Sequence, residues 1–151
     1  MDETEIKLNI LTDCLRKKEN AMVQIAALTE KQKDVLTTDK NNNRFHLYND
    51  EKQSHIKTVI ECDEAFESLL KEIGPALDSD PSKYGEKIKI LQEMIRRVMD
   101  LDVKIRVSED ENGNLIIKQK QPPPPSKTKI KTTSDAQVID AYVRNKKNPK
   151  N

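Results

Sequence analysis

Two long stretches of the chain carry a mostly apolar stripe whose residues are spaced alternately by three and four, the pattern of helices that bury one face. In the first stretch the stripe is Leu8, Leu11, Leu15, Lys18, Met22, Ile25, Thr29, Gln32 and Leu36. In the second stretch it is Phe45, Asn49, Lys52, Ile56, Val59, Asp63, Phe66, Leu70 and Ile73. When the second stripe is reversed against the first, the residue numbers of every opposed pair sum to 81. The pattern predicts a long antiparallel helical hairpin.

The polar residues of the two stripes oppose one another in this register. The three polar pairs are Lys18 with Asp63, Thr29 with Lys52, and Gln32 with Asn49. Apolar pairs would stabilise the hairpin more, so we expect the polar pairs to fix its register and orientation. The register also centres the turn on Asp39–Asn42, where the chain is most polar.

A third helix is predicted because the first carries a second apolar line, Cys14, Ala21, Leu28 and Val35, which one partner helix would not cover. We expect helices over about 4–37, 43–73 and 81–112 in a bundle domain of residues 1–112. Gly74-Pro75 is expected to end the second helix and Asn112-Gly113 the third. The predicted fold class is all-α, an antiparallel α-hairpin plus a third helix in an elongated three-helix bundle.

The third helix holds more apolar residues than its predicted buried stripe needs. The surplus includes Ile90, Met94, Leu101 and Val103. These four residues are the candidate binding site for a helix of another protein. Alternatively, they complete the core or pack in a dimer.

The C-terminal part of the chain has a different composition. Residues 113–133 hold a polyproline run, Pro122–Pro125, and are predicted to be a flexible, disordered linker. Residues 134–147 begin with the capping-box sequence Ser-Asp-Ala-Gln and are predicted to form a short amphipathic helix, with residues to 151 as a tail. We interpret Val138, Ile139 and Tyr142 as a docking helix for a partner or for the chain's own bundle, with plain disorder as the alternative.

Charge divides the chain in the same place. Residues 1–112 hold 18 Lys and Arg against 24 Asp and Glu, a net charge of −6, whereas residues 113–151 hold 9 against 2, a net charge of +7. Binding of nucleic acid or an anionic membrane through the tail is one alternative function. The tail lacks the interleaved aromatic residues of a nucleic-acid reader, however, and no nucleic acid is expected.

The chain shows no arrangement typical of an enzyme, a cofactor site or a metal site. His46 and His55 are nine residues apart and would point to different sides of their helix, and in the predicted register Cys14 and Cys62 are too far apart for an unstrained disulfide. With 35% charged residues and no Trp, the composition is that of long amphipathic helices. The acidic N-terminus does not resemble a signal peptide, so a cytoplasmic protein is expected.

Three sequence features together resemble the FlgN family of flagellar export chaperones. They are Leu-Thr-Glu-Lys-Gln at 28–32, Lys52-Gln53 and Ile56 followed by Asp63 and Phe66, and a third helix opening toward Ile90-Leu91-Gln92. The resemblance covers about residues 5–112; the Tyr-Gly pair seen late in many members is not recognisable, and the polyproline run and basic tail are extra. It implies a non-enzymatic cytosolic chaperone. Its partners would be the C-terminal helices of hook-filament junction (hook-associated) proteins and the flagellar type III export gate with its ATPase complex.

The residues alone are also compatible with a second class of function. The surplus apolar stripe would also suit a structural coiled-coil homodimer or an assembly adaptor. A permanent dimer that ignores an added helix would favour that class over a chaperone.

Overall fold

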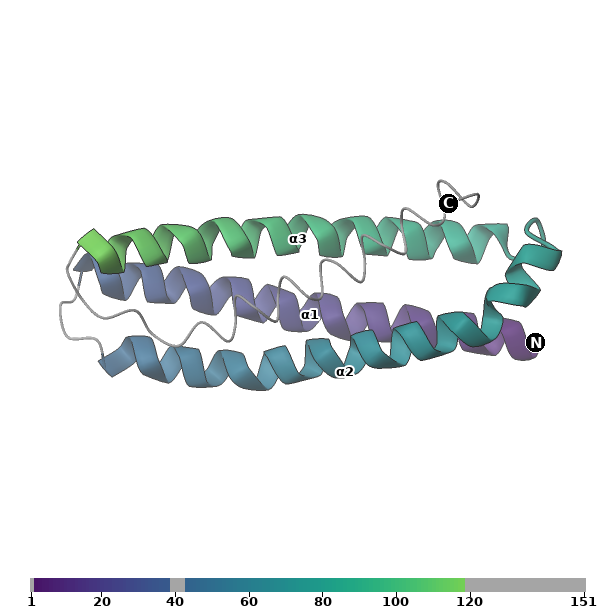
Figure 1. Ribbon diagram of the computed structural model, residues 1–151, viewed down its shortest axis with the longest axis horizontal. Helices are drawn as coiled ribbons and strands as arrows, with labels where there is room; N and C mark the ends of the chain where they lie inside the picture. Colours follow the sequence, from purple (N-terminus) through teal and green to yellow (C-terminus); the bar gives the residue numbers. More distant parts are fainter. Residues whose placement is uncertain (1, 39–42, 119–151) are drawn as a thin grey trace.

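The computed structural model describes residues 2–38 and 43–118 (Figure 1). These residues form three helices and no strand: α1 (Glu3–Thr38), α2 (Asn43–Ser79) and α3 (Gly85–Lys118). The helices lie lengthwise beside one another, with α1 drawn between α2 and α3 (Figure 1). The predicted all-α bundle is confirmed for this part of the chain. The predicted linker beyond residue 118 and the short helix at 134–147 lie outside the described residues.

The helical hairpin of α1 and α2 has the predicted register. All nine stripe positions of α1 are buried, and Lys18 and Asp63, whose numbers sum to 81, form an ion pair. On α2, seven of the nine positions are buried, and Asn49 and Leu70 are partly exposed. An alternating three-four stripe thus brings two antiparallel helices together along their whole length.

Helix α3 runs parallel to α1 in a single register. Four side-chain contacts between them join residues 78 positions apart: Lys87 with Asn9, Arg97 with Glu19, Ser108 with Glu30, and Lys33 with Glu111. In a parallel pair of helices the residue numbers of contacting side chains differ by a constant, whereas in an antiparallel pair they add up to a constant. The turn after α2 brings the start of α3 back beside the start of α1 (Figure 1).

Helix α1 is the centre of the bundle. It packs closely against both neighbours, whereas no Cα atoms of α2 and α3 lie within 8 Å of each other along their described lengths. Side chains cross between the outer helices instead, as in the ion pair of Lys52 on α2 with Glu109 on α3. The bundle is therefore open on the α2–α3 side at the level of the backbone.

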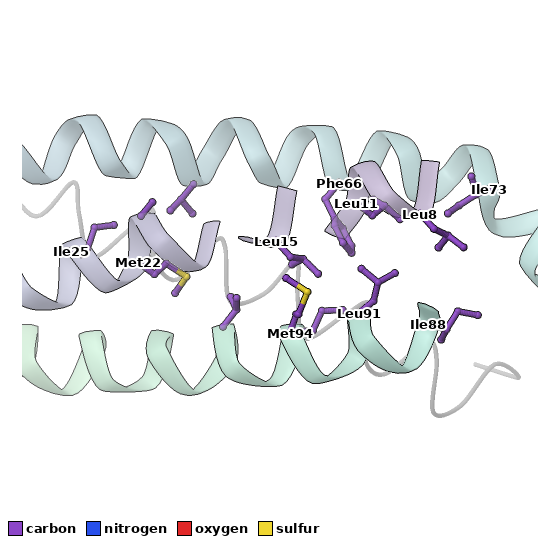
Figure 2. Close-up of a cluster of buried hydrophobic side chains, with 14 of the residues drawn as sticks. Leu8, Leu11, Leu15, Met22, Ile25, Phe66, Ile73, Ile88, Leu91 and Met94 are labelled. Atoms are coloured by element: carbon purple, nitrogen blue, oxygen red, sulfur yellow. The ribbon is translucent and has the colours of Figure 1, made fainter. Parts of the chain in front are cut away.

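The core is a long, thin column of apolar side chains from all three helices. Figure 2 shows Leu11 and Leu15 of α1, Phe66 of α2 and Leu91 of α3 within it. A smaller cluster of Val35, Leu36, Phe45 and Ile116 closes the far end of the bundle. Each fully buried Leu, Ile or Phe contributes roughly 1.5–3 kcal/mol relative to exposure. Burial along the whole length of the helices holds this elongated fold together.

Asp2 links the start of α1 to the start of α3. Its Oδ1 accepts a hydrogen bond from the backbone N–H of Glu5 at 2.7 Å, which caps α1, and its Oδ2 accepts one from the buried Tyr84 hydroxyl at 2.9 Å. The Glu5 amide first, and then Lys83, lower the pKa of Asp2 to about 2. One carboxylate thus fixes where both helices begin.

Helix α2 does not end at Gly74-Pro75 as predicted. It continues to Ser79 with Pro75 inside it, and its last turns bend toward α3 (Figure 1). Proline removes one backbone hydrogen bond and bends a helix, but the extra turn buries Leu77 in the core. The following residues 81–84 form a turn, so α3 begins at Gly85 and not at Pro81.

Helix α3 likewise does not end at Asn112-Gly113. It continues to Lys118, so residues 113–118 belong to the bundle and not to a linker. Asn112 is buried, its amide Nδ2 donates to the backbone oxygen of Thr29 at 3.0 Å, and Ile116 is buried in the end cluster. These contacts offset the roughly 1 kcal/mol cost of a helical glycine.

Candidate functional site

The four predicted binding residues do not form one surface. Ile90 and Val103 are exposed, by 51% and 55%, but they are 13 residues apart and so lie about 140° apart around α3. Leu101 is half-buried against the core, and Met94 is buried within it, beside Leu91 (Figure 2). Met94 therefore completes the core, and the expectation that it is surplus is corrected.

An exposed apolar stripe does exist on α3, formed by Val103, Val107 and, ten residues further on, Ile117, with Asp110 and Asn114 on the same face between them; we call Val103, Val107 and Ile117 the outer stripe. Their side chains are 55%, 51% and 70% exposed. At about 100° per residue, the three lie within about 80° of one another and on the side opposite the buried Ile105. The stripe is one side of a helix whose other side is packed in the core.

The stripe includes Ile117, which the sequence analysis placed in a linker. The signal that could have found it is the periodicity of the buried residues. Ile105, Asn112 and Ile116 continue the alternation of the buried face past Gly113, and Ile117 then falls in line with Val103 and Val107. The Asn-Gly pair concealed this continuity because it is a common helix stop.

Acidic residues lie among the apolar side chains of the outer stripe. Asp110 projects between Val107 and Ile117, and Asp100 lies one turn before Val103; both are exposed. Arg96 and Lys89 are exposed basic residues at the N-terminal end of the same face. Exposed Lys104 and Lys118 lie beside the stripe too, so its flanks carry both signs of charge, and Asp100 and Asp110 are the groups that would attract basic residues of an amphipathic helix.

A buried layer of charges crosses the middle of the bundle. Lys18 of α1 pairs with Asp63 of α2 at 2.5 Å, and Asp102 of α3 pairs with Arg106 one turn later. Asp63 Oδ2 and Asp102 Oδ1 are buried without a hydrogen-bond partner in the described structure. Burial raises the pKa of Asp102, while Arg106 and Lys18 oppose the rise and Asp63 adds to it.

A second polar layer lies nearer the α1–α2 turn. Lys52 Nζ donates to Gln32 Oε1 at 2.8 Å and also pairs with Glu109, which accepts from Thr29 as well. Gln32 Nε2 in turn donates to the backbone oxygen of Phe45. Burial lowers the pKa of Lys52, although Glu109 favours its charged form.

In the second layer, the residues of two predicted polar pairs hydrogen-bond to other partners, and Thr29 and Lys52 meet at the same Glu109 oxygen. Lys52 and Gln32 are buried as expected, but their hydrogen bonds join them to each other and to Glu109 and Phe45, and not Lys52 to Thr29 or Gln32 to Asn49. The sequence pattern considered only two helices, and the acidic partner comes from the third. Both layers are enclosed by the bundle, so they suit fixing the alignment of three helices and not contact with a ligand.

Cysteine and histidine side chains are the remaining reactive groups of the described helices. Cys14 and Cys62 are free thiols, and burial raises the pKa of both, which makes them poor nucleophiles. His55 borders an open depression of about 320 Å³ between α1 and α2; its other lining residues are Lys17, Asn20, Ala21, Val23, Gln24 and Thr58. Residues 2–38 and 43–118 contain no cluster of three or more side chains that could hold a metal ion.

The predicted docking helix, with Val138, Ile139 and Tyr142, lies outside the described residues. Among α1, α2 and α3, none has an apolar stretch long enough to cross a membrane. No family model, no curated protein and no solved structure matches the chain. The resemblance to the FlgN family therefore stays a prediction from the sequence.

Proposed function

We propose that this protein is a helix-binding chaperone of the FlgN type, acting in the cytoplasm on proteins destined for the flagellar type III export gate. The observation that carries the proposal is the outer stripe of Val103, Val107 and Ile117, exposed on a helix whose opposite side is fixed in the core. The proposed cargo is the amphipathic C-terminal helix of a hook-filament junction protein. Such a helix is adhesive before assembly, and covering it reversibly would prevent premature packing.

The opposite side of α3 is held rigidly against the bundle, which favours specific binding by the stripe over non-specific association. Ile105 on the opposite side of α3 is fully buried, and Arg97 and Ser108 tie α3 to Glu19 and Glu30 of α1. A partner helix would thus meet a preformed surface with little ordering cost. Ile90 and the half-buried Leu101, on another side of α3, could extend the contact of a longer or bent cargo.

The size of the stripe favours reversible binding. Val103 and Val107 are about half covered already and Ile117 is 70% exposed, so complete burial would gain roughly 1–2 kcal/mol apiece. A micromolar complex needs about 8 kcal/mol after all costs, so the stripe alone cannot hold a partner permanently. Charge attraction from Asp100 and Asp110 would have to contribute. Ready release is what delivery to an export gate requires.

The rival function is a structural homodimer that pairs the outer stripes of two copies. Analytical ultracentrifugation of the full chain separates the two functions, with and without a synthetic C-terminal helix of a hook-filament junction protein from the same organism. The proposal expects a monomer on dilution and a complex with one peptide per chain. A dimer that persists on dilution and does not take up the peptide would contradict it.

A further inference from the structure

The outer stripe and the segment 134–147 of the same chain match in length. From Val103 to Ile117 the stripe spans 14 helical steps, or about 21 Å at 1.5 Å per residue. The segment 134–147 has 14 residues, and as a helix it would cover the same distance. Val138 and Tyr142, four residues apart, would share one side of that helix, with Ile139 beside them.

The distribution of charges favours one orientation of the segment 134–147 relative to α3. The basic residues Arg144, Lys146 and Lys147 lie at one end of the segment, whereas exposed Asp100 and Glu93 lie toward the N-terminal end of α3 and Lys118 lies at its C-terminal end. An antiparallel arrangement brings the basic end to Asp100, near Arg96, whereas a parallel one would bring it to Asp110 and Glu111 but also closer to Lys118. The net charges of −6 and +7 for residues 1–112 and 113–151 favour the same contact.

The tether between the two surfaces is long enough. The described chain ends at Lys118, next to Ile117 of the stripe, and the 15 residues 119–133 precede the segment. Fifteen residues reach up to about 50 Å, more than twice the length of the stripe. A short flexible tether of this kind gives an effective concentration in the millimolar range, so even a weak contact would be occupied.

We infer that residues 134–147 dock antiparallel on the outer stripe of α3 in the same molecule, with Val138, Ile139 and Tyr142 against Val103 and Val107, which are likewise four residues, or about 6 Å, apart. The segment would then cover the surface proposed for cargo, and cargo would have to displace it. As regulation of cargo binding this rests on the proposed function, but the contact itself does not need cargo. It can therefore be tested in the isolated chain.

The absence of tryptophan from the chain allows a direct test. Tyr142→Trp places a single tryptophan in the docking segment of the full chain, and its fluorescence reports whether it is covered. We expect its emission to move to longer wavelength when Val107→Asp is added, because an aspartate in the stripe would expel the segment. Leu47→Asp is the matched control: Leu47 is an exposed leucine on α2, 61% accessible, and its change should leave the emission unmoved.

A second variant keeps the test independent of folding. Asp100→Lys with Asp110→Lys reverses the charges beside the stripe and should also move the emission to longer wavelength, with an unchanged circular dichroism spectrum. Identical emission in the parent, the Val107→Asp chain and the charge-reversed chain would overturn the inference. An emission that depends on protein concentration would overturn docking within one molecule in favour of a second copy. Because no cargo is present, either failure leaves the proposed function standing.

Discussion

Lys18 Nζ donates a hydrogen bond to Asp63 Oδ1 at 2.5 Å inside the bundle, joining α1 to α2 where both stripes would otherwise be apolar. Only 1% of the Lys18 side chain and 12% of the Asp63 side chain are exposed to solvent. Burial raises the pKa of Asp102 of α3, and the charge of Lys18 is close enough to oppose that rise. The charge of Lys18 thus interacts with carboxylates from both neighbouring helices, and this layer defines how the three helices align.

Breaking this pair from one side should be costly. Lys18→Met would leave Asp63 buried without its cation, and we expect a loss of about 3–5 kcal/mol in the free energy of unfolding. Urea denaturation followed by circular dichroism measures it. The double variant Lys18→Met with Asp63→Leu should recover most of the loss, because it removes both charges. A double variant that is no more stable than the single one would contradict this account of the layer.

Asp102 should make stability depend on pH in the acidic range. Its native pKa is raised above 3.8 by burial, so the native state binds a proton more tightly than the unfolded state. The stabilising contribution is full below pH 3.8 and is lost as pH rises through the native pKa. Asp102→Asn removes the charge and should therefore raise the midpoint of thermal unfolding at pH 7 and have less effect near pH 4.

Asp100→Asn is the matched control for this pH dependence. Asp100 lies on the same helix, two residues earlier, but it is exposed. Its replacement should shift the midpoint little at either pH. If Asp102→Asn destabilised the protein at pH 7, the hydrogen bond from Arg106 would outweigh the cost of burying the carboxylate.

The last turn of α3 should depend on Ile116. This side chain is 4% exposed and packs in the end cluster with Val35, Leu36 and Phe45, so Ile116→Ala should cost about 2–4 kcal/mol. Amide hydrogen exchange at residues 113–118 should accelerate with it. The neighbouring Ile117→Ala, at a side chain that is 70% exposed, should change stability by less than about 0.5 kcal/mol. Equal effects of the two changes would argue against the extended helix.

The hairpin could be predicted from the sequence because its signal is long. Nine paired positions, including the pair Lys18 with Asp63, define one register, and a shift would place charges against apolar residues. The helix ends could not be predicted, because Pro75 and Gly113 are local signals. Their penalties of about 3 and 1 kcal/mol are offset by the burial of Leu77 and Ile116. This burial depends on the tertiary packing of the helices, which local sequence signals do not report.

The candidate site was predicted only in part, and for a related reason. Periodicity shows that α3 has surplus apolar residues, but not which flank of it faces α1. Met94 lies on the flank that packs in the core, whereas Val103 lies on the side away from it. Ile117 was hidden by the false helix end at Gly113. The outer stripe could be recognised only once the packing of α3 was known.

The central claim is that the outer stripe of α3 binds an amphipathic helix, and calorimetric titration of the full chain tests it most directly. The probe is the purified C-terminal helical segment of a hook-filament junction protein from the same organism. We predict saturable binding with one segment per chain, weakened at least tenfold by Val103→Asp and unchanged by Leu47→Asp. No binding by the parent chain, or equal binding by the Val103→Asp chain, would contradict the claim.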